Sequence, residues 1–296
     1  MRQVIALSLC IAAGSLAFGC SGSSDSDSAS SEIERIRCAM REPVNRDFSM
    51  VEQILGGDSS RQSLLQRDAG SVVVPVVFHV ITPDTSGEGA VTDEQIASQV
   101  QVLNDAFAGI TGGSDTPFRF ALTGITRTVN AQWFSLAPGS AEEREAKSAL
   151  RVGDAATLNI YTTSPDGGIL GWAAFPWDYE SDPIFDGVIL HFASVPGGAL
   201  APFNEGDTGV HEVGHWLGLF HTFQGGCSEQ GDLVPDTVAE RTPATGCPVG
   251  RSSCSGSNAE DPIHNFMDYS DDFCLFEFTP NQIANMDQLS ATFRGL

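Results

Sequence analysis

Apolar residues in the middle of the chain gather in short runs that are separated by polar residues, Gly and Pro. Val72 to Ile81 is largely apolar and predicts a strand, and Phe118 to Val129 predicts another through its partial alternation of apolar and polar positions. Leu158 to Thr162 and Val188 to Phe192 are two shorter runs of the same kind. The pattern predicts one compact subdomain from Val72 to Gly209.

Helices are expected where a capping residue precedes a helical pattern. Thr92 is suited to cap a helix that runs to about Phe107. Thr279-Pro280 opens a C-terminal helix, because proline fits the first helical position. Asp207 or Thr208 would cap a further helix, and that helix carries the residues on which the functional interpretation depends.

Residues 211 to 221 read H-E-V-G-H-W-L-G-L-F-H. His211 and His215 are four residues apart, so on a helix they lie on one face and can bind a single metal ion. If the helix continued, His221 would lie about 15 Å beyond His211 along the axis. The helix must therefore stop, and Gly218 is suited to stop it because glycine readily adopts the left-handed conformation that ends many helices.

This histidine spacing favours a catalytic zinc site. Three neutral imidazoles leave the fourth tetrahedral position open for water, and Glu212, beside the first ligand, is placed to accept a proton from that water. The alternative is an amphipathic helix that carries histidines on its polar side. Because the motif fixes five positions and uses three of the six histidines in the chain, we interpret it as the zinc site of a peptidase.

A second motif lies downstream, Asn265-Phe266-Met267-Asp268-Tyr269-Ser270. The long histidine motif followed by such a methionine turn resembles the metzincin zinc peptidases. The resemblance implies that Met267 forms an apolar floor beneath the histidines. It also implies that Tyr269 contacts the metal or donates a hydrogen bond to the oxyanion of the reaction. Ordinary core packing for Met267 and a structural hydroxyl for Tyr269 are the alternatives.

Within the metzincins, residues 226 to 286 resemble the pappalysin (cytophagalysin) family and its small ulilysin-like members. The matching residues are Gly226-Cys227, Asp232-x-Val234-x-Asp236-Thr237, Gly246-Cys247-Pro248, Cys254, Asn265 to Ser270, Asp272-x-Cys274, Phe278-Thr279, Gln282 and Met286. The resemblance implies an α+β fold with two lobes. The N-terminal lobe would hold a twisted mixed sheet with helices, and the C-terminal lobe would be irregular and disulfide-linked.

The resemblance also implies two disulfides, Cys227 to Cys254 and Cys247 to Cys274. From the residues alone, four cysteines allow three pairings. Four thiolates could instead hold a metal ion, although the close C-x-x-C pairs that such sites favour are absent. Each closed loop would add about 3 kcal/mol to stability by restricting the unfolded chain.

A calcium site is a further implication of the resemblance. Asp232, Asp236 and Thr237, with the carbonyl of Val234, match a calcium-binding stretch, and clustered oxygen atoms on a loop suit this hard cation. An acidic, solvated turn is the alternative interpretation.

A specificity pocket is also implied. Asp272 matches an acidic residue at the base of the primed-side pocket in ulilysin-like enzymes, where a buried carboxylate would select a cationic side chain. This predicts cleavage before Arg or Lys. Asp271 is the competing residue.

The N-terminus indicates export. Arg2 and the apolar run from Val4 to Phe18 predict a signal peptide over residues 1–19, too short to serve as a membrane anchor. The segment that ends at Cys20 resembles a bacterial lipobox, which predicts lipidation of Cys20 and an outer-membrane or cell-surface lipoprotein. Ordinary signal peptidase could instead cut after Ala17. Residues 20–34 then form a flexible tether.

Cys38 is the remaining cysteine, and it lies in a predicted pro-segment over residues 35–67. Its thiolate could occupy the fourth zinc position and hold the enzyme latent, as in similar metzincin zymogens. The alternative is an unpaired thiol in a disordered region or one that captures a partner. Arg61 and Arg67 are the expected activation cuts.

The substrate is expected along the edge of the sheet. The resemblance implies that the last strand of the subdomain forms the upper edge of the cleft, so we expect the peptide near Gly171-Trp172-Ala173 and the strand that begins at Val188. His79 and His191 lie on predicted strands. We interpret both as core or rim histidines, because the set of three zinc ligands is already complete.

The net charge is −23, from 38 acidic and 15 basic residues, which argues against nucleic-acid binding. We interpret residues 68–296 as the catalytic domain of a secreted or lipid-anchored, monomeric zinc endopeptidase that acts on peptides or proteins. One alternative is a catalytically silent surface binding module on the same scaffold. Another is a zinc hydrolase of non-peptide amides or esters, which would have a closed pocket instead of an open groove.

Overall fold

The computed structural model describes residues 35–56, 67–228, 230–256 and 259–296. The predicted signal peptide and tether, with Ala17 and Cys20, lie outside these residues, as does Arg61. From Arg35 onward the described residues belong to one compact unit, so the predicted pro-segment and catalytic domain can be described together. In the described ranges, no helix is long and apolar enough to cross a membrane.

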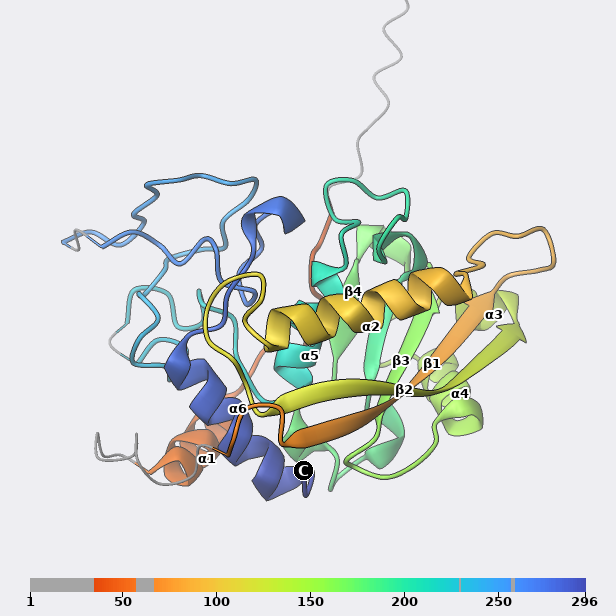
Figure 1. Cartoon of the computed structure of the whole chain (residues 1–296), viewed down its shortest axis with the longest axis horizontal. Helices are drawn as coiled ribbons and strands as arrows, with labels where there is room; N and C mark the ends of the chain where they lie inside the picture. The colour runs from red at the N-terminus through yellow and green to blue at the C-terminus, as the bar shows by residue number, and fades with distance from the viewer. Residues whose placement is uncertain (1–34, 57–66, 229, 257–258) are drawn as a thin grey trace, which may run out of the picture. The chain divides into compact units, whose positions relative to one another are not determined.

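The N-terminal lobe is built on a five-stranded twisted sheet (Figure 1). Its strands are β1 (Val72–Thr82), β2 (Phe118–Val129), β3 (Leu158–Thr163), β4 (Gly171–Ala173) and β5 (Val188–His191). The strand order is β2-β1-β3-β5-β4; β4 alone pairs antiparallel with its neighbour. The four predicted strands are confirmed. The prediction that the last strand forms the edge is wrong, because β4 folds back outside β5.

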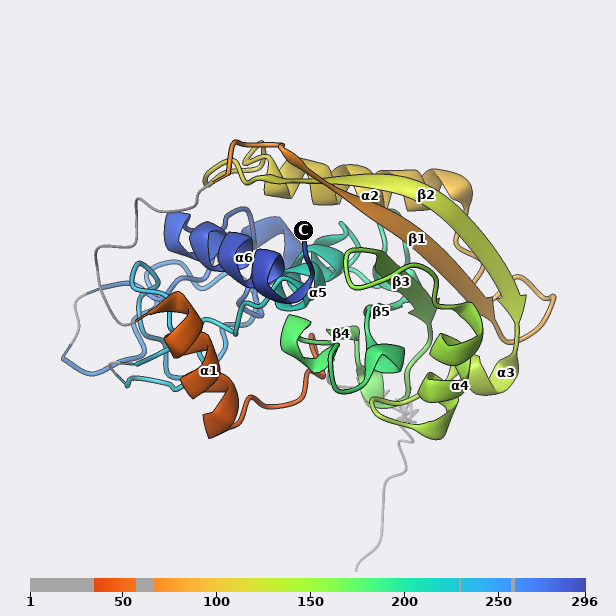
Figure 2. The same cartoon turned by 90° about the horizontal axis from the view of Figure 1, so that it is seen from below.

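Helices cover both faces of this sheet. The α-helices of the described chain are α1 (Asn45–Leu55), α2 (Asp93–Phe107), α3 (Ala131–Phe134), α4 (Ala141–Leu150), α5 (Asp207–Trp216) and α6 (Pro280–Phe293), of which α1 packs against α6 and not on the sheet. Successive side chains of a strand point to opposite faces. Phe78 of β1 therefore packs in the core under α2 and α5, whereas Ile81 packs in the core under α3 and α4. Figure 2 shows α2 and α4 on opposite sides of the sheet.

The C-terminal lobe, residues 222–279, is irregular. Its described residues contain no α-helix and only a short 3-10 turn, Asp272–Cys274. Disulfides join Cys227 to Cys254 and Cys247 to Cys274, each across 27 residues. The two-lobe α+β fold and the pairing implied by the resemblance are thus confirmed, and the four-thiolate metal site is excluded.

The remaining 3-10 turns are Asp166–Gly168, Pro176–Asp178, Pro183–Phe185 and Phe192–Ser194. The predicted pro-segment contains α1, a helix that the sequence interpretation missed. Its Val51 and Leu55 pack with Phe175, Phe220 and Leu289 of the catalytic domain. Residues 35–56 of the predicted pro-segment are therefore packed into the same compact unit as the rest of the described chain.

The predicted helix caps can be compared with the structure. Thr92 and Thr279 cap α2 and α6 through their side chains, as predicted. The prediction that Asp207 or Thr208 caps α5 is wrong, because the N-cap is Gly206 in a left-handed conformation and Asp207 is the first helical residue. A side chain at Gly206 would also collide with Pro196, whose Cγ lies 2.9 Å from the position of an added Cβ.

Candidate metal centre

The predicted zinc ligands lie on α5 and on the turn that follows it. His211 and His215 share one face of α5, which ends at Trp216. Gly218 then adopts a φ of 107°, so the predicted helix stop is confirmed. A side chain at this position would also meet α6, because an added Cβ would lie 2.7 Å from Cδ1 of Leu289. The turn brings His221 back to the other two histidines.

The three imidazoles converge through their Nε2 atoms. Nε2 of His215 lies 3.1 Å from Nε2 of His211 and 3.0 Å from Nε2 of His221. The Nδ1 atoms of His211 and His215 each lie 2.7 Å from a backbone carbonyl, that of Phe266 and that of Leu219. Donation from Nδ1 leaves the Nε2 lone pair free for a metal ion. Burial lowers the pKa of all three imidazoles, which favours the neutral form that binds zinc.

Met267 lies directly against α5 at Gly214, which stands between His211 and His215 in the sequence. An added Cβ at Gly214 would lie only 2.4 Å from Sδ of Met267. Met267 is fully buried. The glycine inside the histidine motif is therefore needed to make room for the methionine floor.

Glu212 and Cys38 face the histidine cluster. Sγ of Cys38 and the ligand atoms of the three histidines all lie within 4.8 Å of one another. The thiol donates to Oε2 of Glu212 at 3.6 Å, while Oε1 of Glu212 is buried with no hydrogen-bond partner among the described residues. Burial raises the pKa of Glu212 well above its usual value. This carboxylate is therefore suited to take up a proton.

The hydroxyl of Tyr269 lies on the same side of the histidines as Cys38. It is 3.3 Å from Nε2 of His221 and donates to the carbonyl of Cys38 at 3.1 Å. Burial raises the pKa of Tyr269, so the phenol stays protonated and can donate a hydrogen bond. Its backbone N–H donates to Oδ1 of Asp268 at 2.7 Å, which fixes the turn.

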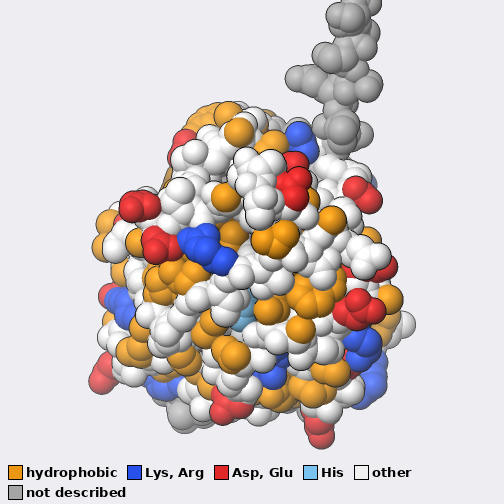
Figure 3. All heavy atoms as spheres, turned by 90° about the vertical axis from the view of Figure 1, so that its right-hand side faces the viewer, with side chains coloured by type: hydrophobic (Ala, Val, Ile, Leu, Met, Phe, Trp, Pro, Cys, Tyr) orange, Lys and Arg blue, Asp and Glu red, His pale blue; other side chains and the backbone are white. Residues whose placement is uncertain are grey.

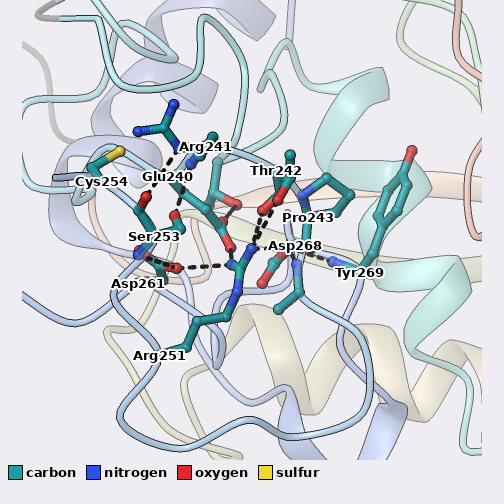
Figure 4. Close-up of polar contacts among 12 residues, drawn as sticks. Glu240, Arg241, Thr242, Pro243, Arg251, Ser253, Cys254, Asp261, Asp268 and Tyr269 are labelled. Atoms are coloured by element: carbon teal, nitrogen blue, oxygen red, sulfur yellow. Dashed lines mark hydrogen bonds and ion pairs between the residues drawn. The ribbon is translucent and has the colours of Figure 1, made fainter.

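A buried polar cluster holds this turn in the C-terminal lobe (Figure 4). Arg251 forms ion pairs with Glu240 and with Asp261, the second at 2.8 Å. Burial raises the pKa of Glu240 to about 8 and that of Asp268 to about 6. The described residues of this lobe contain no α-helix or strand that could position Tyr269. Buried polar contacts hold its turn in place instead.

Asp272 is buried against the predicted pro-segment. Oδ1 of Asp272 forms an ion pair with Arg37 at 2.8 Å, and both side chains are buried. Arg37 also donates to the carbonyl of Ser270 at 2.8 Å, and Oδ2 of Asp272 accepts the N–H of Glu205 at 2.9 Å. The competing residue, Asp271, is only partly buried. The structure thus brings Asp272, and not Asp271, to a buried cationic side chain.

The predicted calcium ligands are brought together in part. The hydroxyl oxygen of Thr237 lies 2.7 and 2.9 Å from the two carboxylate oxygens of Asp232 and 2.8 Å from the carbonyl of Val234. Burial raises the pKa of Asp232 to about 7. The carboxylate of Asp236 does not join them, because it accepts from the hydroxyl of Thr279 at 2.6 Å, at the start of α6.

The other histidines on strands lie outside this cluster. His79 hydrogen-bonds Thr126 at 2.8 Å and Asn159 at 3.0 Å, and Nδ1 of His191 accepts the N–H of Ala193 at 3.1 Å. Both are buried, as the core interpretation predicted.

Sequence reasoning missed two residues of the predicted pro-segment that contact the candidate site. These are Arg37 and Met40, whose Sδ accepts the N–H of Ala173 on β4 at 3.1 Å. The signal for Arg37 was its position next to Cys38, which lies beside the three histidines. Nothing in the sequence indicated Met40.

Comparison with known proteins agrees with the geometry. Residues 201–291 match the model of the peptidase M43 family, described as pregnancy-associated plasma protein-A. An extracellular metalloprotease of Pyricularia oryzae is 40% identical over 264 residues, covering 88% of this chain and 90% of that protein. Extracellular metalloprotease 1 of Coccidioides posadasii is 43% identical over 230 residues, covering 76% and 79%.

Solved structures show the same relationship. Mature mirolysin of Tannerella forsythia, in complex with a cleaved peptide, superposes with a TM-score of 0.65 at 29% identity, covering 74% of this chain and 91% of that one. A promirolysin mutant of the same organism gives 0.67 at 27% identity, covering 87% and 94%. The chain therefore belongs to the pappalysin family of metzincins and is a metalloendopeptidase.

Proposed function

We propose that His211, His215 and His221 bind one catalytic zinc ion and that Glu212 acts as general base in peptide hydrolysis. The observation that carries this is the convergence of three Nε2 lone pairs beside a buried carboxylate that has an unpartnered oxygen. A zinc ion held there would lower the pKa of water and polarise the scissile carbonyl. Glu212 accepts the proton of the attacking water and delivers it to the leaving nitrogen.

Tyr269 completes the proposed catalytic set. Its protonated hydroxyl, close to His221, can donate to the oxyanion that develops on the scissile carbonyl. The test is peptide cleavage by the activated full chain beside Glu212→Gln and Tyr269→Phe, with a chelator control. Zinc-dependent cleavage that Glu212→Gln abolishes is expected. No cleavage by a folded, zinc-loaded protein would contradict the proposal.

We further propose that the pocket at Asp272 takes Arg or Lys, so that cleavage occurs before a basic residue. The support is Arg37, which fills this pocket in the described chain. Its guanidinium pairs with Asp272, donates to Ser270 and lies over the ring of Phe203 at 5.4 Å. A mixed peptide library tests this: Asp272→Asn is expected to remove the preference for a basic residue while cleavage itself persists. An unchanged preference would sink the pocket assignment.

The pro-segment, residues 35–67, is proposed to hold the enzyme latent. Cys38 occupies the position that faces the three histidines and Glu212. Backbone hydrogen bonds hold the segment along β4. The N–H of Ile36 donates to the carbonyl of Gly168, just before β4, at 3.0 Å, and the N–H of Ala39 donates to the carbonyl of Gly171, the first residue of β4, at 2.9 Å. A thiolate there would fill the fourth zinc position. Cys38→Ala is expected to make the uncut chain active, and an inactive uncut variant would count against this role.

A structural calcium ion is proposed at Asp232, Val234 and Thr237, whose oxygen atoms converge within one loop, with Asp232 and Val234 buried. Asp236 would contribute indirectly, because its carboxylate caps α6. This site is distinct from the zinc site in its donor atoms, which are all oxygen.

Export to the outside of the cell is proposed because the relatives reported above are named extracellular. The division into signal peptide (1–19), tether (20–34), pro-segment and catalytic domain (68–296) remains part of the proposal, with lipidation of Cys20 or a cut after Ala17 as its two outcomes. Intact mass of the exported protein distinguishes them. The proposed partners are peptide or protein substrates. On the face shown in Figure 3, acidic and basic side chains are interspersed with hydrophobic ones.

A further inference from the structure

Arg67 is fixed to α6 through one carboxylate. The side chain of Asp287 is only 2% exposed. Its Oδ2 accepts the backbone N–H of Arg67 at 3.0 Å, and its Oδ1 accepts the guanidinium of Arg67. The guanidinium also donates to the carbonyl of Asp287 at 3.2 Å and to Oγ of Ser290 at 3.3 Å. It lies 5.8 Å from the ring of Phe118. These contacts seat both the main chain and the side chain of Arg67 on a single turn of α6.

The contact with the backbone nitrogen is the unusual part. A neutral amide N–H within a chain already donates to this carboxylate, whereas an ammonium group in the same place would donate and also carry a positive charge, which adds a Coulombic attraction to the buried carboxylate. We propose that Asp287 is the binding site for the α-ammonium group of the mature enzyme, whose chain begins at Arg67, one residue before the catalytic domain bounds given above.

The reaction that would create this group follows from the proposed preference for cleavage before a basic residue, and in that respect the inference rests on the proposed function. Hydrolysis breaks the C–N bond in front of Arg67. Water supplies the oxygen of the new carboxylate, and its protons convert the released nitrogen to an ammonium group. The side chain of Arg67 is 28% exposed, so it can leave Asp287 to enter the Asp272 pocket of another molecule and return afterwards.

The contact between Arg67 and Asp287 is connected to the candidate catalytic site through α6. Met286, beside Asp287, is part of the main core, and Leu289 lies against Gly218, where the chain turns toward His221. An ammonium group bound at Asp287 would therefore stabilise the helix that supports the turn before the third zinc ligand. It would act only after the bond in front of Arg67 is cut.

The test separates the ammonium group from the side chain. In a Glu212→Gln background, an enteropeptidase recognition sequence is placed so that the folded full chain is cut either directly before Arg67 or one residue earlier, before Gln66. Both products keep the guanidinium contacts, but only the first has an ammonium group at the nitrogen of Arg67. The Arg67-first product is expected to melt about 2–4 °C higher. Equal melting temperatures would overturn the proposal.

Two variants identify the partner. Asp287→Asn is expected to remove the difference between the two products, and persistence of the difference would overturn the assignment to Asp287. If Asp287→Asn does not fold, Arg67→Gln serves instead, because it removes the guanidinium contacts but keeps the nitrogen, and the difference is expected to persist.

The natural start of the chain is tested on the wild-type protein. After incubation of the full chain, intact mass is expected to show a product that begins at Arg67, and a stable product that begins elsewhere, for instance at Arg61, would overturn the proposed mature start. A chain that never cleaves itself would count against the proposed peptidase function. The comparison of melting temperatures, which uses an added protease, still decides the ammonium site in that case.

Discussion

The two lobes of the molecule are stabilised by different physical means. In the N-terminal lobe, strands and helices bury a continuous hydrophobic core that extends to α5 and α6. In residues 222–279, the separate hydrophobic cluster found among the described residues consists of Ala244, Ile263 and Cys274, with Cys247 packed against it. The lobe also contributes Phe266, Met267, Leu275 and Phe278 to the main core. Away from that core, two disulfides and the ion pairs of Arg251 hold its described chain together.

This difference divides the work at the catalytic site. The helical lobe fixes His211 and His215 at a spacing set by α5. The irregular lobe supplies Tyr269 and Asp272, which would act on the oxyanion and on the substrate side chain. Damage to the first lobe should therefore unfold the whole domain, whereas damage to the second should first change turnover and selectivity.

The largest expected effect is a cavity in the sheet lobe. Phe78→Ala removes a fully buried ring under α2 and α5 and should cost about 4 kcal/mol of unfolding free energy, with both lobes lost together. Denaturant unfolding measures this cost. Val73→Ala on the same strand is the matched control, because Val73 is 60% exposed and should change stability little. Loss of activity in Phe78→Ala without loss of stability would break the comparison.

The same contrast explains how far the sequence could be interpreted. Four of the five strands of the first lobe were predicted to within one residue, because side-chain burial in a sheet leaves a local pattern of apolar positions. The three-residue β4 was not predicted as a strand, since it is too short to show such a pattern. The second lobe has no such pattern, and its disulfides were predicted only through resemblance to a family. The contact of Arg37 with Asp272 joins residues 235 positions apart, which no local pattern records. Likewise, the family resemblance assigned Asp236 to calcium, whereas the fold uses its carboxylate at the start of α6.

The next effect in size concerns the disulfides. Replacing Cys247 and Cys274 by Ser should cost about 3 kcal/mol, because each bridge closes 27 residues of chain. Cys274 ends the turn that carries Asp272, so KM for peptides with arginine after the cut should rise more than kcat falls. Replacement of Cys227 and Cys254 by Ser is the matched control, because that disulfide closes a loop of the same length. Equal changes in selectivity for both pairs would show that the effect is not local.

A smaller effect is expected from the buried ion pairs. Arg251→Met leaves Glu240 and Asp261 without their cation and should cost about 2 kcal/mol, at the low end for a broken buried pair because the side chain of Arg251 is 21% exposed. The cost should be greater at pH 9 than at pH 6, since the pKa of Glu240 is already raised to about 8 and its ionised form would then lack a partner. Thermal unfolding at both pH values measures this. Arg241→Met, an exposed neighbour, should change little.

The smallest effect tests the proposed calcium loop. Burial raises the pKa of Asp232 from 3.8 to about 7, so without calcium the folded protein loses stability as pH rises from about 4 to about 7, where only the unfolded chain is fully ionised. Calcium binds the ionised form, so its stabilising effect should appear as pH rises through 7. We expect an excess of calcium to add about 1 kcal/mol at pH 8 and little at pH 5.5, measured by thermal unfolding. Asp232→Asn should abolish the response, whereas Asp236→Asn should lower stability through the cap of α6 and keep it. A calcium response that is equal at both pH values, or that survives Asp232→Asn, would show that this loop holds its oxygen atoms together without the ion.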